Sequence, residues 1–235
     1  MSLYVVKQLL KEVEPMRDRV AKDALFDAFA EVAKAFANGR RAELIDVLAQ
    51  GERHVDDLAA VIHQSVANTS FHLRALATAG LVTTRRAGTR IYYRLASDRV
   101  VELWAATRDV AAAHLDNLDE LVRDYLGDRS LLDEVGRDEL TARLARGDVV
   151  VIDVRPEAEY AAGHIAGARS IPIERLAASI KDLPAELEVV AYCRGPYCVF
   201  AHDAVRLLRR RGRRARRLQD GYPEWQRASL PVEMV

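Results

Sequence analysis

Apolar and polar residues follow one another along this 235-residue chain with periods that change from block to block, and the first block has the period of helices. One apolar face recurs at steps of three and four residues: Leu25, Phe29, Val32 and Phe36. This spacing predicts an amphipathic helix that ends at Asn38-Gly39. A second helix is predicted over residues 41–51. Two more helical patterns share residues 55–80 and meet at His63-Gln64, where Ser65 can cap the second of them.

The period changes to two after Gly80. Residues 81–95 form two β-rich runs on either side of Ala87-Gly88, which predicts a hairpin with arginines at its tip. Residues 98–126 return to a helical pattern, which predicts one long amphipathic helix closed by Gly127. A helix of that length outside a compact core usually joins two domains or pairs with another chain.

From about Leu131 onward, strand and helix signals alternate. Residues 149–154 and 188–192 are continuous apolar runs of the kind found in strands buried on both faces of a parallel sheet. Helical segments lie between and after these runs. The last block is therefore predicted to be α/β.

Composition indicates a soluble protein with no membrane partner, because no apolar run approaches the roughly 18 residues that a membrane span needs. The N-terminal stretch carries Lys7, Lys11 and Glu12 where a signal peptide would have an unbroken apolar core, so we expect a cytoplasmic protein. The formal net charge is zero, but residues 58–97 contain no Asp or Glu and five arginines. A neutral chain can thus carry a basic face suited to nucleic acid.

A helix, a turn, a second helix and a basic hairpin form the layout of a winged helix-turn-helix, in which the second helix lies in the major groove and the wing follows the backbone. The predicted buried stripe of the second helix is Val66, Leu73, Leu76 and Ala77. The candidates for DNA contact are the cap residue and polar or basic residues of the second helix, together with hairpin arginines: Ser65, Asn68, Thr69, Ser70, His72, Arg74, Arg85, Arg86 and Arg90. The expected partner is a double-stranded DNA operator; a winged helix used only for protein contacts is the alternative.

The sequence resembles the ArsR family of dimeric bacterial repressors over roughly residues 18–115. The matching parts are residues 38–48, the pattern Ser65, Ser70, His72 and Leu73, and the wing end Tyr92-Tyr93-Arg94-Leu95. The resemblance implies a homodimer formed through residues 20–37 and 99–126. Metal-sensing members carry cysteines where this chain has residues 53–59, or a ligand set on the last helix that Asp109 and His114 do not match in spacing. We therefore expect no metal site here.

Two cysteines, Cys193 and Cys198, are the only ones in the chain. Cys193 is placed where a predicted buried strand ends and a helix begins, and backbone N–H groups together with the positive helix end favour the thiolate there. Cys198 is a second reactive thiol or a resolving partner. A zinc clip from Cys193, Cys198 and His202 lacks a fourth ligand. The arginine-rich residues 206–217 form a solvated face or a supplementary DNA contact.

The last block resembles the rhodanese family of sulfurtransferases from about residue 135 onward. The matching motifs are residues 152–172, Cys193-Arg194-Gly195 and residues 219–233. The resemblance implies that Cys193 holds sulfane sulfur as a persulfide, with a small sulfur donor and a thiol acceptor as partners. It assigns the amide cradle around the persulfide to the rest of the loop: Arg194, Gly195, Pro196, Tyr197 and Cys198. Related phosphatases need an arginine six residues after the cysteine, where this chain has Val199.

We thus predict two domains, a mainly α winged helix-turn-helix over 1–97 and an α/β rhodanese-like domain with a parallel sheet over 131–235, joined by a dimerisation and linker helix over 98–130. The leading hypothesis is a dimeric DNA-binding transcriptional regulator that senses or transfers sulfane sulfur through Cys193, without a cofactor. The alternative is a working thiosulfate or persulfide sulfurtransferase whose DNA-binding half only regulates its own operon. An idle cysteine on a fold kept for packing is a third reading. The residues leave open the operator, the donor and acceptor, the direction of the response, and whether the two cysteines form a disulfide or polysulfide bridge.

Overall fold

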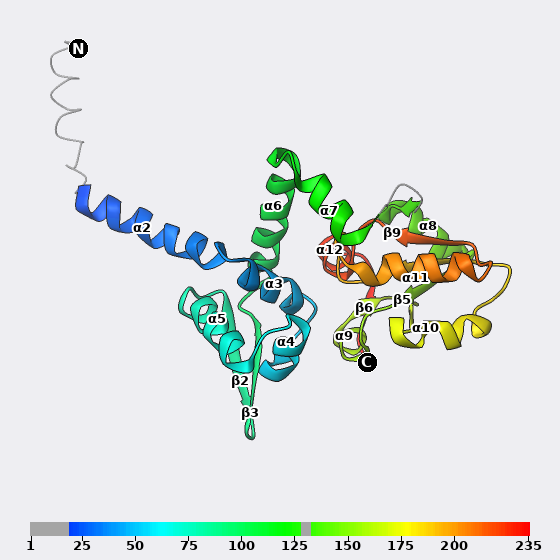
Figure 1. The fold of residues 1–235 in the computed structure, drawn as a ribbon, viewed down its shortest axis with the longest axis horizontal. Helices are drawn as coiled ribbons and strands as arrows, with labels where there is room; N and C mark the ends of the chain where they lie inside the picture. The colour runs from blue at the N-terminus through cyan, green and yellow to red at the C-terminus, as the bar shows by residue number, and fades with distance from the viewer. Residues whose placement is uncertain (1–18, 128–132) are drawn as a thin grey trace, which may run out of the picture.

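The computed structural model of the protein describes residues 19–127 and 133–235. A helical half with a small antiparallel sheet precedes an α/β half, and the two lie side by side (Figure 1). Both predicted fold classes are confirmed. No helix within these two ranges is long and apolar enough to cross a membrane.

The helices of the first half follow the predicted order. They are α2 (Arg19–Phe36), α3 (Gly39–Leu48), α4 (Val55–Val61) and α5 (Val66–Thr78), with the short strand β1 (Arg53–His54) before α4. The Asn38 side chain accepts hydrogen bonds from the first amides of α3, and Ser65 Oγ accepts one from the Asn68 amide at 3.2 Å. The predicted cap at Ser65 is therefore confirmed. Buried Leu44, Ile45 and Leu58 belong to the core that these helices share.

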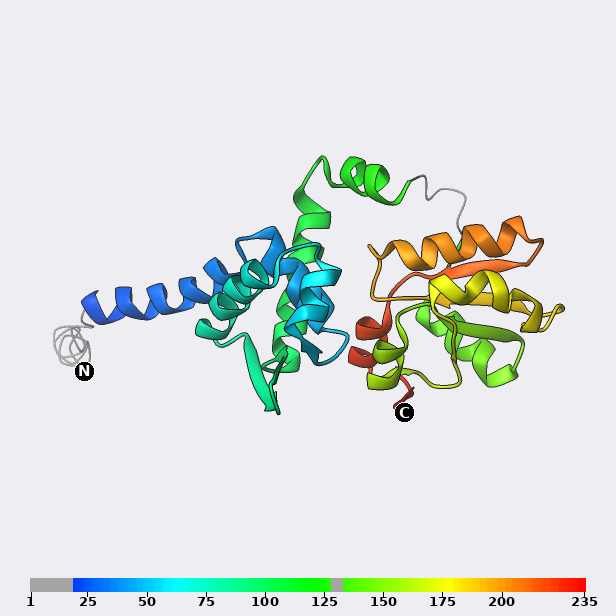
Figure 2. The same cartoon turned by 60° about the horizontal axis from the view of Figure 1, so that its bottom comes forward.

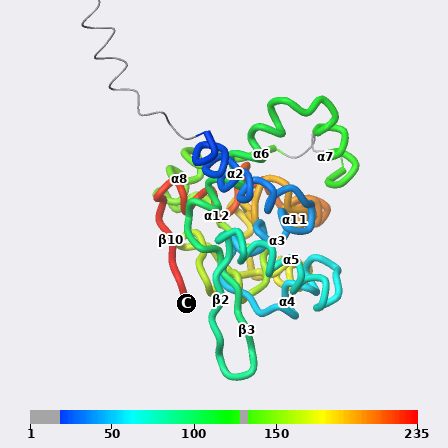
Figure 3. The backbone as a smooth tube through the Cα atoms, turned by 90° about the vertical axis from the view of Figure 1, so that its left-hand side faces the viewer, coloured from blue at the N-terminus to red at the C-terminus, as the bar shows by residue number. Residues whose placement is uncertain are grey.

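The wing is a regular hairpin of β2 (Val82–Ala87) and β3 (Arg90–Leu95), with β1 on the other side of β3. Ala87 pairs with Arg90, and Gly88 has a φ of 62°, a left-handed conformation that glycine adopts without strain. The hairpin projects from the helices (Figure 3). Its arginines are thereby held away from the core.

The single long helix expected over residues 98–126 is instead two helices, α6 (Asp98–His114) and α7 (Leu118–Leu126). Leu115 has extended backbone angles, which end α6. Val100 and Trp104 of α6 pack on the core of the first half, so α6 does not stand outside a compact core as expected. The two helices arch from the first half towards the second (Figure 2).

The second half is built on a parallel sheet. Among the described residues five strands form it in the order β4-β9-β8-β5-β7, and the two predicted apolar strands are its neighbours β5 (Val149–Asp153) and β8 (Glu188–Tyr192). The other elements are β4 (Glu134–Val135), α8 (Arg137–Arg146), α9 (Glu157–Ala162), β6 (His164–Ile165), β7 (Arg169–Ser170), α10 (Ile173–Ser179), the 3-10 helix η1 (Ile180–Asp182), α11 (Val199–Arg210), β9 (Ala215–Leu218), α12 (Tyr222–Arg227) and β10 (Val232–Glu233).

Helices cover both faces of this sheet. Leu176 of α10 and Val205 of α11 pack on one face, while Leu140 of α8 and Trp225 of α12 pack on the other. Burial on both faces explains why the sequence of β5 and β8 is apolar without alternation. The carboxyl ends of these strands carry the loop 193–198, which is the site described next.

Candidate functional site

The loop from Cys193 to Cys198 joins β8 to α11. Cys193 is only 1% exposed, and Cys198 occupies the cap position before α11. The structure contains a disulfide between them, with the two Cα atoms 6.4 Å apart. The sequence left this bridge open. The structure therefore brings both predicted sulfur residues together in one loop.

The N-terminus of α12 supports the loop from behind. Tyr222 donates its amide to the Cys193 carbonyl at 3.1 Å, and Glu224 Oε2 accepts from the Gly221 amide at 3.0 Å. A methyl group added at Gly221 would collide with the backbone of Arg194 and Gly195. Only glycine lets the two backbones approach this closely.

Buried charges lie directly under the loop. Arg155 Nε donates to both carboxylate oxygens of Asp153, at 3.0 and 3.1 Å, and both side chains are fully buried. Burial is the largest single effect and opposes the charge of Arg155, but the hydrogen bonds to Asp153 together with the negative charges of Asp153 and Glu159 raise the pKa of Arg155. The Arg155 Nη2 also donates to the Gly163 carbonyl at 2.7 Å.

The buried carboxylate of Glu159 holds two arginines. Arg194 Nη2 of the loop lies 2.6 Å from Glu159 Oε1, and Arg53 Nη2 from the first half lies 2.7 Å from the same oxygen. The loop and the DNA-binding half therefore share one carboxylate.

Gln50, just after α3, reaches the loop from the first half. Its Nε2 donates to the Arg194 carbonyl at 3.2 Å, and its Oε1 accepts from Arg155 Nη1 at 3.0 Å. The side chain is almost completely buried. Gln50 thus connects α3 both to the backbone of the cysteine loop and to the buried ion pair beneath it.

A second bridge runs through Arg108 of α6. Its Nη2 lies 2.5 Å from Glu224 Oε1 of α12, and its Nη1 lies 3.7 Å from Asp46 Oδ1 of α3. Trp104 Nε1 donates to the same Asp46 oxygen at 2.8 Å. Burial raises the pKa of Asp46, although the Trp104 hydrogen bond and the Arg108 charge oppose that shift. A methyl group on Gly195 would lie 3.3 Å from Arg108 Nη1, so the guanidinium lies against the loop.

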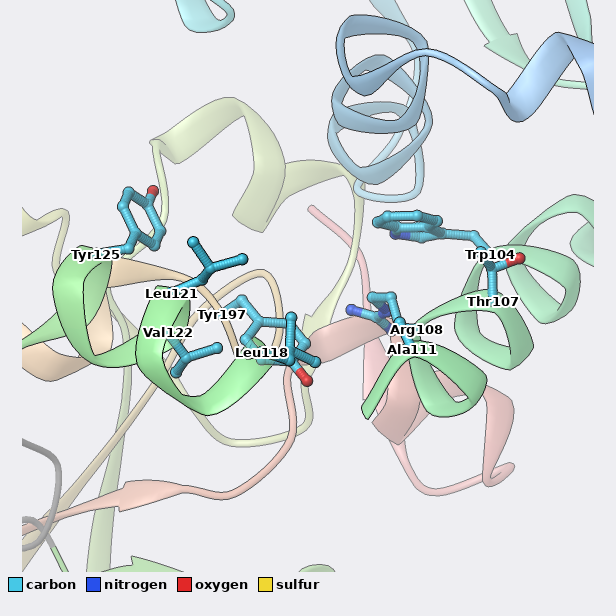
Figure 4. A pocket seen from close by; sticks show the side chains of 9 residues that line it. All are labelled: Trp104, Thr107, Arg108, Ala111, Leu118, Leu121, Val122, Tyr125 and Tyr197. Carbon is cyan, nitrogen blue, oxygen red and sulfur yellow. The ribbon is translucent and has the colours of Figure 1, made fainter. Parts of the chain in front are cut away.

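A pocket of about 390 Å³ opens beside the loop, between α6 and α7 (Figure 4). Its lining is largely apolar: Trp104, Thr107, Arg108, Ala111, Leu118, Leu121, Val122, Tyr125 and Tyr197. Tyr197 is the residue before Cys198, and it lines this pocket together with residues of α6 and α7. The loop therefore borders the pocket through this side chain.

The predicted DNA-binding residues lie on α5 and the wing. Ser65 and Arg74 are exposed, while Asn68 and Ser70 are partly exposed. The Asn68 amide group donates to Gln64 Oε1 at 2.7 Å. Arg85, Arg86 and Arg90 are exposed on the hairpin, where a phosphate backbone could approach them.

Two of the predicted contacts on α5 face the core instead. Thr69 and His72 are buried, and the Thr69 hydroxyl donates to the Ser65 carbonyl at 3.0 Å. Burial lowers the pKa of His72, and the charges of Arg41 and Arg40 lower it further. With Leu73 and Leu76, these residues form one stripe at helical spacing, whereas Val66 and Ala77 of the predicted stripe are exposed. We therefore leave Thr69 and His72 out of the DNA contact.

The wing arginines differ in their surroundings. Arg85 Nε lies 3.1 Å from both carboxylate oxygens of Glu52, and its guanidinium stacks 4.9 Å from the centre of the Tyr92 ring. The hydrogen bond from Arg85 lowers the pKa of Glu52. Arg86 Nε donates to the Gly88 carbonyl at the hairpin tip. Arg85 is thus already engaged by a carboxylate.

Sequence reasoning missed the residues that connect the halves. Gln50, Arg53 and Arg108 lie in no motif, whereas Glu159 lies inside the motif at 152–172 that carried the rhodanese resemblance. In the described ranges, no group of three or more His, Cys, Asp or Glu residues could hold a metal ion.

A winged helix-turn-helix joined to an α/β half with a cysteine loop defines a DNA-binding regulator that carries a rhodanese-like domain. Residues 38–84 match the profile of the arsR family of bacterial regulatory proteins, and residues 136–228 match that of the rhodanese-like domain. The HTH-type transcriptional regulator Rv0324 of Mycobacterium tuberculosis is 48% identical over 212 residues, which cover 90% of this chain and 93% of that protein. The chain therefore belongs to the ArsR family of transcriptional regulators, in a form that carries a rhodanese-like domain.

Other relatives match one half each. A sulfurtransferase of Allochromatium vinosum is 31% identical over 104 residues, which cover 43% of this chain and 95% of that protein. A solved homodimeric winged helix-turn-helix DNA-binding domain from Mycobacterium bovis is 47% identical, covers 43% of this chain and 91% of its own, and superposes with a TM-score of 0.39.

Proposed function

We propose that the protein is a homodimeric repressor-type regulator, located in the cytoplasm, whose DNA affinity changes when Cys193 accepts sulfane sulfur. One observation carries the proposal: the Cys193–Cys198 disulfide lies on a loop to which Gln50 of the DNA-binding half donates a hydrogen bond. A change in the bonding of these sulfurs alters the loop backbone to which α3 is attached. The chemistry of the second half is thereby coupled to the position of the first.

The proposed reaction has two steps, sulfur transfer to Cys193 and disulfide formation with Cys198. The Cys193 thiolate attacks the terminal sulfur of a persulfide R–S–SH; the donor S–S bond breaks, R–S⁻ leaves, and Cys193 carries –S–SH. The Cys198 thiolate then attacks the Cys193 sulfur, which forms the Cys193–Cys198 disulfide and releases HS⁻. Thiol–disulfide systems of the cytoplasm keep such pairs reduced until an oxidising sulfur species arrives.

The two cysteines are expected to differ under mutation. Cys193→Ser should abolish both sulfur uptake and the effect of a persulfide donor on DNA binding. Cys198→Ser should leave uptake on Cys193 intact but prevent the lasting disulfide state. Mass spectrometry of the loop peptide after donor treatment, with titration of each variant against its own upstream DNA, measures both. Persulfide found only on Cys198, or a Cys193→Ser protein that still responds on DNA, would contradict the proposal.

A second candidate is a working sulfurtransferase whose DNA-binding half only regulates its own operon. The similarity of the second half to a sulfurtransferase over nearly that protein's whole length favours it. Multiple turnovers with thiosulfate and a thiol acceptor, without any change in DNA affinity, would establish this function in place of sensing. A single stoichiometric sulfur uptake accompanied by a change in DNA affinity supports the regulator.

A further inference from the structure

The DNA-binding half contacts the first part of the cysteine loop, at Arg194 and Gly195. Gln50 donates a hydrogen bond to the Arg194 carbonyl, Arg108 lies against Gly195, and Tyr197 borders the pocket between α6 and α7. Cys193 behind these contacts is 1% exposed. The two halves lie next to each other in the view of Figure 2.

We infer that Gln50, Arg53 and Arg108 close the cysteine site and restrict it to low-molecular-weight sulfur donors, so that persulfides carried on proteins are excluded. The inference rests on the proposed function, in which Cys193 is the sulfur acceptor. It assigns to three residues of the DNA-binding half a positioning role in the sulfur chemistry of the other half. None of them reacts with sulfur.

Gln50 is suited to this role because its side-chain amide donates one hydrogen bond and accepts another across the interface. Nε2 holds the Arg194 carbonyl, and Oε1 holds Arg155, whose charge is otherwise balanced by Asp153. A carboxylate at this position could not donate to the Arg194 carbonyl. Gln50→Glu therefore keeps the size of the side chain but removes its hold on the loop.

The arginines act as bridges and do not serve as anion sites. Arg108 already has Glu224 and Asp46 as carboxylate neighbours, and Arg53 shares Glu159 with Arg194. A sulfur anion would have to compete with these carboxylates, of which Glu159 is fully buried. Their geometry instead connects α3, α6 and the residues before α4 to the α/β half.

The size of the donor decides whether it can enter. A protein donor needs a contact surface of about 800 Å² on each partner, and on the loop Gln50 and Arg108 already contact Arg194 and Gly195. A small persulfide requires only local opening of the loop. Closure by the DNA-binding half therefore selects donors by size.

The test uses the full chain with Cys198→Ser, in which Cys193 is the single thiol. Cys193 is modified in parallel with N-ethylmaleimide, which is small, and with a polyethylene-glycol maleimide, which is large and reacts by the same chemistry. The rate with the small reagent divided by the rate with the large one is high when the site is closed. Gln50→Glu and Arg108→Ala should each lower the ratio about tenfold, which corresponds to the loss of one or two interface hydrogen bonds. Arg108→Lys, which keeps the charge, should recover part of the ratio.

Two exposed residues provide matched controls. Arg99→Ala lies on the same helix as Arg108, and Gln226→Ala lies on α12 next to the interface. Both should leave the ratio unchanged. Thermal unfolding of each variant shows that it is folded. An unchanged ratio in folded Gln50→Glu and Arg108→Ala proteins would overturn the inference.

A second measurement needs no interface variant. The reduced wild-type protein should take sulfur from glutathione persulfide and not from persulfidated serum albumin, as judged by mass spectrometry of the loop peptide. Equal uptake from both donors contradicts closure. If neither donor loads Cys193, the proposed function fails, while the maleimide ratio still decides whether the site is closed.

Discussion

At the scale of single residues, the site is organised by charges that are buried only because each has a fixed partner. Asp153 and Arg155 neutralise each other under the loop, and the single carboxylate of Glu159 pairs with both Arg194 and Arg53. Isolated charges could not remain there, because a buried charge without a partner costs several kcal/mol. These pairs fix the floor on which the cysteine loop rests.

Removing one member of the central pair should be far more damaging than removing a surface pair. Asp153→Asn leaves the Arg155 charge buried without compensation, and we expect a loss of about 3–5 kcal/mol in the unfolding free energy. Urea denaturation followed by tryptophan fluorescence in a Trp104→Phe background, in which Trp225 is the single tryptophan, measures it. The control is Arg175→Ala, whose exposed pair with Glu157 should contribute less than about 1 kcal/mol. Equal losses in the two variants would disprove this account.

Acid stability should depend on Glu188, which starts β8. Burial opposes its charge, but hydrogen bonds from Arg143 and the charge of Arg216 dominate and lower its pKa below the usual 4.5. A lowered pKa contributes stability that is present above the unfolded-state value and lost as the pH falls through the folded value. Urea midpoints measured from about pH 6 down to pH 3 should therefore fall less steeply for Glu188→Gln than for the wild type. Parallel curves for the two proteins would count against a stabilising role for the Glu188 charge.

At the scale of elements, the wing and α5 present a basic face whose arginines are not equivalent. Arg85 is held by Glu52 and the Tyr92 ring, whereas Arg90 lies exposed beside the hairpin tip. A phosphate must displace Glu52 before it can pair with Arg85. The carboxylate therefore reduces what Arg85 can contribute to DNA binding.

The wing variants should consequently form a series. Arg90→Ala should weaken binding to all DNA sequences and reduce the slope of log K against log salt by about one unit. Arg85→Ala should have a smaller effect, and Glu52→Gln should tighten binding because it releases Arg85. Fluorescence anisotropy over a range of salt concentrations measures all three, with Arg175→Ala as a remote control. A salt slope that Arg90→Ala does not change would rule out wing contacts.

At the scale of the whole molecule, α2 extends away from the rest of the chain (Figure 1). Several of its apolar side chains are exposed: Phe26 is 59% and Phe29 60% exposed, and Val110 of α6 is 61% exposed. Exposed apolar surface of this kind is typical of association sites. Of the predicted helical face, Val32 and Phe36 pack against the core of the first half, whereas Leu25 and Phe29 are left exposed.

A homodimer should cover these side chains. Light scattering at micromolar concentration should give twice the mass of one chain, and the double change Phe26→Asp with Phe29→Asp should give monomers that bind DNA weakly. Met234→Asp, at an exposed position near the end of the chain, should remain dimeric. A wild-type protein that is monomeric under these conditions would be incompatible with the proposal.

Local patterns in the sequence determined most of the elements and the identity of the sulfur residues. Side-chain period depends on neighbours within a few residues, so the helix before Asn38, the cap at Ser65 and the buried strands β5 and β8 could be predicted from spacing alone. Cys193 and Cys198 were found because the motif around them is continuous in the chain. The approximate outline of each half follows from the same short-range information.

The tertiary structure decided the rest, because it depends on residues that are far apart in the chain. Gln50 and Arg194 are separated by 144 positions, and Arg108 and Glu224 by 116, so no local spacing could pair them. The rotation of α5 that buries Thr69 and His72 was set by the helices packed against it, since small and polar residues fit either face of a helix by pattern alone. Long-range packing also placed Gln50 of the DNA-binding half against the cysteine loop, and the proposed coupling between the two halves rests on this contact.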